Sequence, residues 1–149
     1  MKYLIAMVLV GISVVMVGCD SKGTPVAFAS TCDKANDDAR IETTGYFNNT
    51  GSAMCSKSGN GPMRCPINFV ETPGKEDGIV RAEIDLGAGA SSIEDVKGKG
   101  LTIHDDKNEV IDNNQKVKIV ADVNVLDTPR EDKKLQNCWV VVKKIEKAQ

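Results

Sequence analysis

Cysteines are the residues whose spacing constrains chemistry most in this chain, and they occupy positions 19, 32, 55, 65 and 138. Four of them follow the amino-terminal region and form an even set, which in an exported protein normally ends as disulfides. Their spacing contains no Cys-x-x-Cys, so neither a redox pair nor a zinc knuckle is indicated. Of the three possible pairings we expect Cys55 with Cys65, closing a glycine-rich loop, and Cys32 with Cys138, tying the domain's start to its last strand.

The amino-terminal region predicts export. One charge, Lys2, precedes an apolar run of fourteen residues from Leu4 to Val17, and polar residues from Asp20 onward end it. A membrane-spanning helix needs about twenty apolar residues. The run is therefore typical of a signal-peptide core, and an uncleaved membrane anchor is the alternative.

The run ends in Met16, Val17, Gly18 and Cys19, which resembles the bacterial lipobox, although Met16 replaces the usual leucine. The resemblance implies a diacylglyceryl group on the Cys19 sulfur and cleavage after Gly18. Membrane lipid joined to Cys19 would then anchor the protein, because two or more acyl chains hold a protein stably on a bilayer. Asp20 resembles an inner-membrane retention signal. We therefore expect a protein of the bacterial cell envelope, lipid-anchored and facing the periplasm, with Asp20 favouring the inner membrane.

The chain divides accordingly into three parts. We expect a signal peptide over residues 1–18, the lipidated cysteine with a tether over 19–31, and one domain over 32–149. Nineteen Lys and Arg against twenty-one Asp and Glu give a formal net charge of -2. That balance lacks the basic excess that phosphate backbones select, which makes nucleic acid a disfavoured partner.

The domain reads as a series of short strands. Alternating apolar and polar residues predict half-buried strands, and the segments concerned are 40–47, 64–70, 80–86 and 117–125. A fifth strand, 138–145, is apolar on both faces, as for a strand covered on two sides. Gly45 suggests a bulge or a tight coil inside the first strand. Ser91 to Lys97, with a serine cap and a glycine stop at Gly98, predicts one or two turns of helix.

This order of strands resembles the oligonucleotide/oligosaccharide-binding fold, a five-stranded barrel known as the OB fold. The residues that carry the resemblance are the segments ARIETTGYF, CPINF, GIVRAEIDL, SSIEDVK, NQKVKIVADVNV and NCWVVVKKI. We therefore expect an all-β domain with one short helix, a disulfide-stapled, five-stranded OB-like barrel that follows an N-terminal lipoprotein signal peptide. A plain sandwich or an open meander is the alternative.

Several motifs imitate catalytic or cofactor sites. Gly87-Ala-Gly-Ala-Ser-Ser92 resembles part of a dinucleotide-binding fingerprint, but the helix expected after it is too short to cross a sheet, so we expect no cofactor. The acidic turns at 33–38 and 105–109 lack the spacing that wraps calcium, and solvated turns without a metal are expected. His104 has no nucleophile motif beside it, so we expect no catalytic residues and no enzyme.

The OB resemblance implies that ligands lie across the second and third strands and under the first and fourth connecting loops. The candidate ligand-binding residues are aromatic or basic, and they are Trp139, Tyr46, Lys133 and Lys134. The function expected is a non-catalytic binding or accessory module whose partner is an unknown envelope protein or polymer. Two alternatives stay open, namely OB-type binding of single-stranded nucleic acid or an oligosaccharide, and an envelope hydrolase that uses His104.

Overall fold

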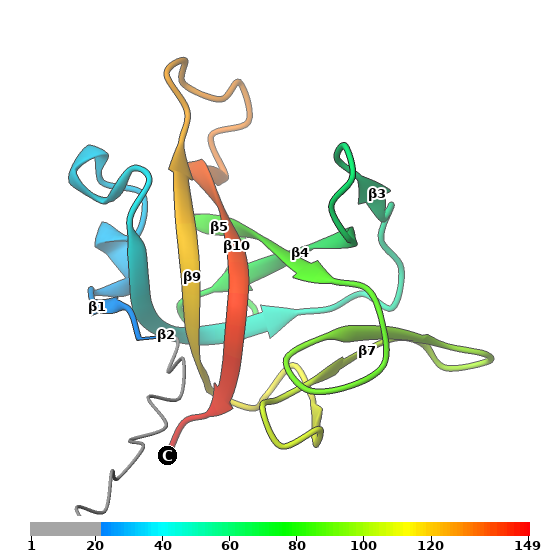
Figure 1. Cartoon of the computed structure of the whole chain (residues 1–149). Helices are drawn as coiled ribbons and strands as arrows, with labels where there is room; N and C mark the ends of the chain where they lie inside the picture. Colours follow the sequence, from blue (N-terminus) through cyan, green and yellow to red (C-terminus); the bar gives the residue numbers. More distant parts are fainter. Residues whose placement is uncertain (1–21) are drawn as a thin grey trace, which may run out of the picture.

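The computed structural model describes residues 22–149, and this part of the chain is almost entirely β-structure (Figure 1). Its strands are β1 (Thr24–Pro25), β2 (Arg40–Asn48), β3 (Ser56–Lys57), β4 (Met63–Val70), β5 (Ile79–Asp85), β6 (Ile93–Val96), β7 (Gly100–His104), β8 (Val110–Ile111), β9 (Val117–Val125) and β10 (Leu135–Lys147). Two short 3-10 helices, η1 (Phe28–Ser30) and η2 (Lys34–Asn36), precede β2. The five predicted strands correspond to β2, β4, β5, β9 and β10.

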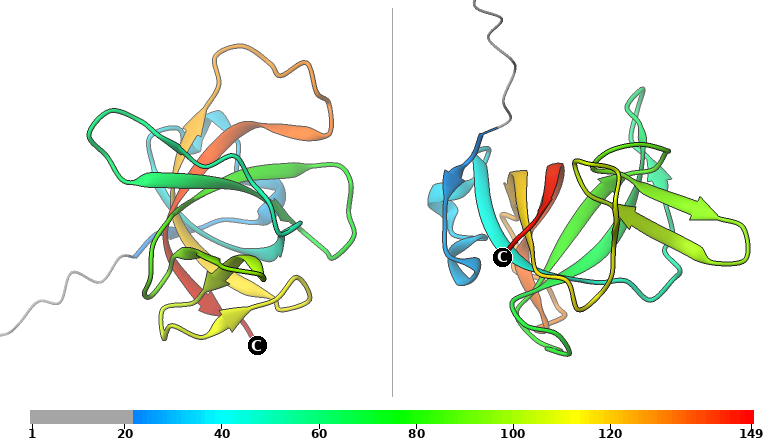
Figure 2. Two further views of the ribbon diagram at one scale, coloured as in Figure 1. Left: turned by 90° about the vertical axis from the view of Figure 1, so that its right-hand side faces the viewer. Right: turned by 90° about the horizontal axis from the view of Figure 1, so that it is seen from below.

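The larger sheet has the strand order β1-β2-β9-β10-β5-β4-β3, and β2 also pairs with β4. Each of the five long strands, β2, β4, β5, β9 and β10, therefore pairs with two of the other four. β5 and β10 run parallel, while the other pairs of long strands are antiparallel. β6, β7 and β8 form a separate three-stranded sheet beside it (Figure 2).

β2 pairs with two long strands, β9 and β4, because its partner changes at Gly45. Arg40 to Gly45 pair with β9, whereas Tyr46 to Asn48 pair with β4. A side chain does not fit at this corner, since a Cβ on Gly45 would lie 2.6 Å from the Val70 carbonyl oxygen and 2.8 Å from the Phe69 ring. The sequence predicts a bulge or a tight coil at Gly45, and the structure shows a change of partner strand at this residue.

The core follows the alternation that the sequence predicts. In β5 the side chains of Val80, Ala82 and Ile84 are fully buried, and the charged residues between them face outward. Phe47 and Phe69 pack against each other with ring centroids 5.3 Å apart. Burial of such rings contributes a large share of the stability of a small domain.

The helix predicted over Ser91–Lys97 is wrong, because this segment forms β6 and pairs with β7. Ser91 adopts a left-handed φ of 51°, and Ser92 does not cap a helix. Its hydroxyl donates instead to the carbonyl oxygens of Gly87 and Gly89. Ile93 becomes fully buried opposite Ile103, and burial of such β-branched residues in a strand outweighs the local capping signal.

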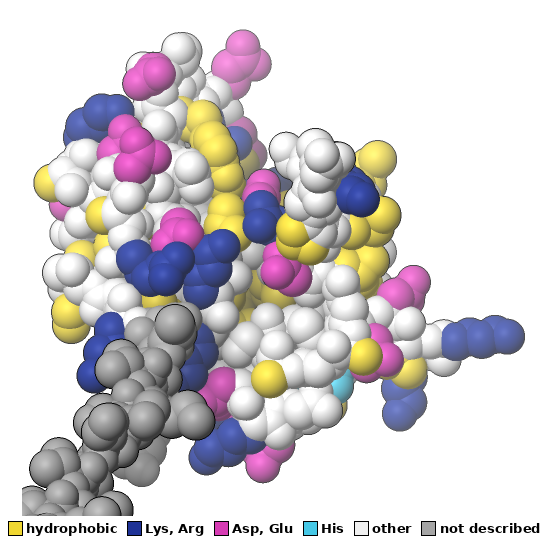
Figure 3. Space-filling model, viewed as in Figure 1, with side chains coloured by type: hydrophobic (Ala, Val, Ile, Leu, Met, Phe, Trp, Pro, Cys, Tyr) yellow, Lys and Arg dark blue, Asp and Glu magenta, His cyan; other side chains and the backbone are white. Residues whose placement is uncertain are grey.

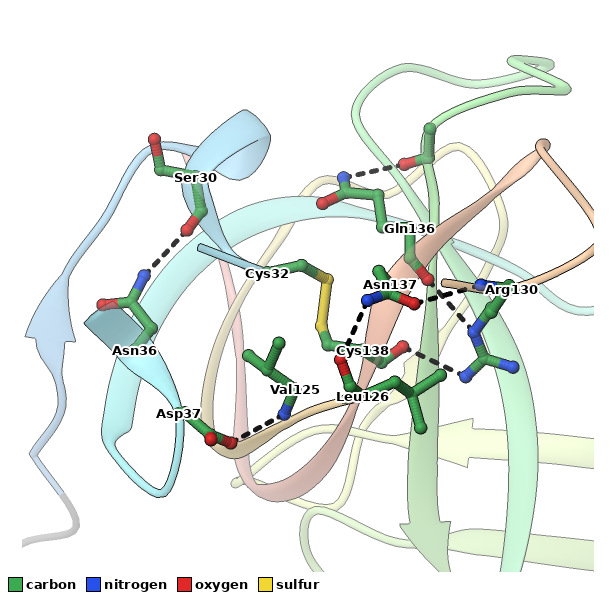
Figure 4. The surroundings of a disulfide bond; sticks show 11 residues. Ser30, Cys32, Asn36, Asp37, Val125, Leu126, Arg130, Gln136, Asn137 and Cys138 are labelled. Atoms are coloured by element: carbon green, nitrogen blue, oxygen red, sulfur yellow. Dashed lines mark hydrogen bonds between the residues drawn. A yellow bond between two sulfur atoms is a disulfide. The ribbon is translucent and has the colours of Figure 1, made fainter. Parts of the chain in front are cut away.

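Both predicted disulfides are present, Cys32–Cys138 and Cys55–Cys65. The first joins the segment before β2 to the start of β10 (Figure 4). The second closes the loop that contains β3.

The segment before β2 is packed onto the domain. β1 pairs in parallel with β2, and the Phe28 ring lies 5.5 Å from that of Phe69. The tether expected over 19–31 therefore does not extend through residues 24–31. The predicted signal peptide, Cys19 and Asp20 lie outside the described residues. Within residues 22–149, no helix is long and apolar enough to cross a membrane.

Candidate ligand-binding site

Trp139 lies on the outer face of β10. Its neighbours in the strand, Cys138 and Val140, are fully buried, so the intervening tryptophan points away from the core and is half-buried. In register it stands opposite Arg81 of β5 and Asn124 of β9. This position supplies an aromatic side chain at the edge of a polar surface.

A row of polar residues continues from Trp139 across the neighbouring strands. Arg81 of β5 is in register with Asn68 of β4, and Asn68 is in register with Asn48 of β2. Arg81 Nη1 donates to Asn68 Oδ1 over 2.9 Å. The outer surface of four strands thus presents an indole, a guanidinium and two amides in sequence.

The surface is hollowed where the row meets the loop between β2 and β4. The hollow has a volume of about 230 Å³ and is lined by Asn48, Pro66, Ile67, Asn68 and Arg81 from the strands and by Thr50, Ser52, Ala53 and Met54 from the loop. Amide, hydroxyl and guanidinium groups predominate among the polar atoms. We call this the Arg81 hollow.

The loop segment 49–55, which we call the strap, is held at both ends. At its start Asn49 and Asn113 exchange hydrogen bonds of 2.9 and 3.0 Å, and Asn49 Nδ2 donates to the Leu101 carbonyl over 2.7 Å. The Leu101 amide donates to Gly51 O over 3.3 Å. At its end Cys55 is bonded to Cys65 of β4. The strap is therefore fixed relative to both sheets.

A second hollow, of about 330 Å³, also borders the strap. Ser52 and Ala53 line both hollows. The remaining lining residues of the second hollow are Gly51, Cys55, Leu86, Asp95 and Leu101. The next residue of the strap, Met54, is 90% exposed, so this region combines two concave surfaces with a prominent thioether.

The structure does not bring the other predicted ligand residues to these hollows. Tyr46 is half-buried on β2 opposite Val70. Lys133 and Lys134 lie in the exposed loop between β9 and β10. Trp139 does not line either hollow, and neither do these three residues.

The β9–β10 loop is fixed by Arg130 rather than by its lysines (Figure 4). The Arg130 guanidinium donates to the carbonyl oxygens of Gln136 and Cys138 over 3.1 and 3.3 Å, and its backbone amide donates to Asn137 Oδ1. Asn137 in turn donates to the Leu126 carbonyl over 2.9 Å. These hydrogen bonds of Arg130 hold the loop beside the Cys32–Cys138 disulfide.

His104 lies at the end of β7, close to Glu94 and next to the buried Asp105. Its Nε2 atom lies 3.6 Å from Glu94 Oε2 on β6. The adjacent Asp105 is buried and accepts hydrogen bonds from the backbone amides of Lys107 and Glu109 over 3.0 and 2.7 Å. The carboxylate of Asp105 therefore shapes the turn after β7.

The acidic turns considered for calcium are paired with lysines. Asp37 accepts a 2.7 Å bond from Lys34, which holds the pKa of that carboxyl below its usual value, and it also accepts the Val125 amide. Glu109 pairs with Lys147 over 2.6 Å. Among residues 22–149, no three His, Cys, Asp or Glu side chains are grouped so as to hold a metal.

Sequence reasoning missed the residues of the Arg81 hollow. Arg81, Asn68 and Asn48 are ordinary outward-facing positions of three separate strands, and only the register brings them together. A signal did exist for Arg81, because it lies in the predicted third strand at an outward position. The predicted Cys55–Cys65 disulfide indicates that the end of the strap is attached to β4.

Comparison with known proteins gives little further information. No protein family model matches this chain, and no curated protein matches it significantly. Among solved structures, a protein assigned as an aspartyl-tRNA synthetase from Leishmania major Friedlin superposes with a TM-score of 0.47 at 14% sequence identity. The match covers 95% of this chain but 23% of that one. We infer nothing about fold or function from a likeness of that degree.

Proposed function

We propose that this protein is an exported lipoprotein of the bacterial cell envelope, anchored through Cys19 and acting as a non-catalytic binding module. The apolar run and the lipobox-like Met16 to Cys19 support the export and the anchor. All four remaining cysteines are paired in disulfides, and such bonds form and persist in oxidising compartments such as the periplasm.

The proposed domain architecture is an OB-type barrel. The support is the order in which the long strands pair. β2 pairs with both β9 and β4, and the third and fifth long strands, β5 and β10, run parallel. The three-stranded sheet β6-β7-β8 takes the place of the short helix of the OB order. In OB folds the second and third strands carry the ligand face, and these strands correspond to β4 and β5.

The observation that carries the proposed binding role is the Arg81 hollow. It lies across β4 and β5, beneath the first connecting loop, and the Cys55–Cys65 disulfide together with Asn49 holds that loop in place. A site that is fixed before binding loses less conformational entropy when the ligand arrives. The hollow is therefore suited to recognise a ligand.

The lining favours an oligosaccharide of the envelope over single-stranded nucleic acid. Hydroxyl and amide groups of a glycan can exchange hydrogen bonds with Asn48, Asn68 and Ser52, while Arg81 would donate to a carboxylate or carbonyl oxygen. Single-stranded nucleic acid binds instead to aromatic platforms with a basic surround. The domain carries a net negative charge, which opposes the binding of a phosphate backbone.

The anchor is tested by labelling cells with radioactive palmitate. We expect label in the wild-type protein and none in the Cys19→Ala variant. A wild-type protein without label, or equal label in both, would overturn the lipidation of Cys19.

The binding site is tested by titrating the full-length, detergent-solubilised protein with soluble peptidoglycan glycan strands and, separately, with a short single-stranded oligonucleotide. Arg81→Ala should weaken glycan binding about tenfold or more, because a hydrogen bond to a charged group contributes about 1.5–3 kcal/mol. Arg64→Ala is the matched control, since Arg64 faces outward on β4, pairs with Asp85 and does not line the hollow. Equal losses in both variants, or tight binding of the oligonucleotide alone, would contradict the assignment.

A further inference from the structure

The chain enters the described domain at a fixed point on β2. Thr24 and Pro25 pair in parallel with Ile41 and Glu42, and the Val26 amide donates to the Glu42 carbonyl over 2.9 Å. Gly23 is packed so closely on the Ile41 carbonyl that a Cβ would overlap it. Residues 23–26 are therefore tied to the edge of β2.

This attachment limits how far the domain can stand from the proposed anchor. Cys19 is three residues before Lys22, and an extended chain spans at most about 3.6 Å per residue, or about 11 Å in all. Acyl chains on Cys19 would place that residue at the headgroup level, because the polar region flanks a hydrocarbon core about 30 Å thick. The surface around Lys22 must then lie within about 11 Å of the headgroups.

The surface around Lys22 carries interleaved charges with an excess of cations. A hollow of about 240 Å³ is lined there by Lys22, Gly23, Glu42, Lys118, Val120, Lys144 and Glu146. Lys118 and Lys144 both reach Glu146, over 2.9 and 3.0 Å. The bond to Glu146 raises the pKa of Lys118 above its usual value, so this lysine stays charged at neutral pH.

The same outer face extends across β2, β9 and β10. Arg40 and Lys143 both pair with Asp122, over 2.7 and 3.7 Å, and Asp106 lies 3.7 Å from Lys144 at the far end. Lys and Arg side chains are visible over these strands in Figure 3. The face, which we call the tether face, has five cations, Lys22, Arg40, Lys118, Lys143 and Lys144, and four acids, Glu42, Asp106, Asp122 and Glu146.

The sign of the tether face is opposite to that of the domain as a whole. Without Lys2 and Asp20, residues 22–149 contain eighteen Lys and Arg against twenty Asp and Glu. An anionic bilayer attracts basic residues near its surface and repels acidic ones. Such a bilayer would therefore favour the tether face over the acidic remainder of the domain.

We propose that the tether face rests on the headgroups of anionic phospholipids and that this contact directs the Arg81 hollow away from the bilayer. The inference depends on the proposed lipidation of Cys19. β1 and β3 lie on opposite sides of the molecule (Figure 1), and the loop that contains β3 continues from the strap of the Arg81 hollow. A ligand in the envelope can then reach the hollow while the protein stays on the membrane.

The test uses the full-length lipidated protein on vesicles that contain phosphatidylglycerol and a headgroup-labelled nitroxide lipid. Trp139 is the single tryptophan, so Trp139→Phe provides a background in which a new tryptophan reports its own position. Thr44→Trp places it on the tether face beside Lys118, and Ser58→Trp places it in the exposed turn after β3. We expect the nitroxide to quench most of the fluorescence of the first variant and little of the second.

Charge variants test the lipid preference. Lys118→Glu combined with Lys144→Glu should abolish most of the quenching at position 44, whereas Lys97→Glu combined with Lys99→Glu, in the turn between β6 and β7, should leave it unchanged. Replacing phosphatidylglycerol by phosphatidylcholine should reduce it as well. Equal quenching at positions 44 and 58, or quenching that is indifferent to these lipids and lysines, would overturn the inference while leaving the anchor intact. A protein that fails to float with vesicles would overturn the anchor and this inference together.

Discussion

Gly45 determines whether β2 can pair with both of its long neighbours. The strand leaves β9 at this residue and reaches β4 at the next one. A glycine permits the approach of the Val70 carbonyl oxygen, which would lie 2.6 Å from a Cβ. Backbone atoms cannot move aside as a flexible side chain can, so the fold depends on the missing side chain at this position.

Gly45→Ala is expected to destabilise the domain by about 1–3 kcal/mol, as overpacking of a tight site does. The measurement is the urea midpoint of unfolding, followed by near-ultraviolet circular dichroism. Gly87→Ala is the matched control, because nothing lies within 4 Å of its Cβ position, and it should change stability by less than about 0.5 kcal/mol. Similar midpoints for both variants would contradict the role given to Gly45.

Asp122 shows how single ion pairs affect stability on the tether face. The Arg40 guanidinium, bonded to the carboxylate, holds the pKa of Asp122 below its ordinary value of 3.8. Because the pKa is lower in the folded state, the stabilisation is complete above pH 4 or so and is lost as the pH falls through the folded value. The partly exposed pair is screened by solvent, so its contribution stays within about 1 kcal/mol.

Asp122→Asn should therefore lower stability slightly at pH 7 and flatten the loss of stability below pH 4. Urea midpoints between pH 2 and pH 7 measure both effects. Arg40→Gln removes the same Arg40–Asp122 pair, so the double variant should resemble Asp122→Asn, which also loses the contact with Lys143. The pair would not act as described if the losses of stability in the two single variants added fully in the double variant. The same conclusion would follow if Asp122→Asn lost stability below pH 4 as steeply as the wild-type protein.

At the scale of elements, the strands could be predicted and the β6–β7 hairpin could not. Alternation in β5 and β9 directly reports which residues reach the core. Ser91 and Gly98 imitate helix ends, and the helix they suggest is excluded only because Ile93 is buried against the distant Ile103. The same holds for the ligand site, since Arg81, Asn68 and Asn48 meet through strand register, which no local pattern specifies.

The two disulfides should differ in what they stabilise. Removing Cys32–Cys138 by alanine substitution of both residues releases a separation of 106 residues and is expected to cost about 5 kcal/mol, against about 3 kcal/mol for Cys55–Cys65 with its separation of 10. Thermal unfolding of the two double variants measures this difference.

Loss of Cys55–Cys65 should also weaken glycan binding at the Arg81 hollow, because it frees one end of the strap. Loss of Cys32–Cys138 should leave the affinity of the folded fraction unchanged. Equal effects of the two disulfides on affinity would argue against a fixed strap as the basis of recognition.

At the scale of the whole molecule, the chain enters the domain on one side, and the proposed binding site lies on another. β1 fixes the entry of the chain on the side of β2, and the loop between β2 and β4 carries the strap on the opposite side (Figure 1). The proposed anchor can be predicted from sequence because Met16 to Cys19, which resemble a lipobox, form a local pattern. The sequence does not indicate the side on which the chain enters, which arises from the parallel pairing of Thr24 with Ile41.

The central claim is that Cys19 is the lipidated first residue of the mature protein. Intact-mass measurement of the protein purified from bacterial membranes, followed by fragmentation of its amino-terminal peptide, tests this most directly. The account predicts a chain that begins at Cys19 and carries a diacylglyceryl group on its sulfur, with no free thiol elsewhere. A chain that retains residues 1–18, or one that begins at Cys19 without added lipid, would contradict it.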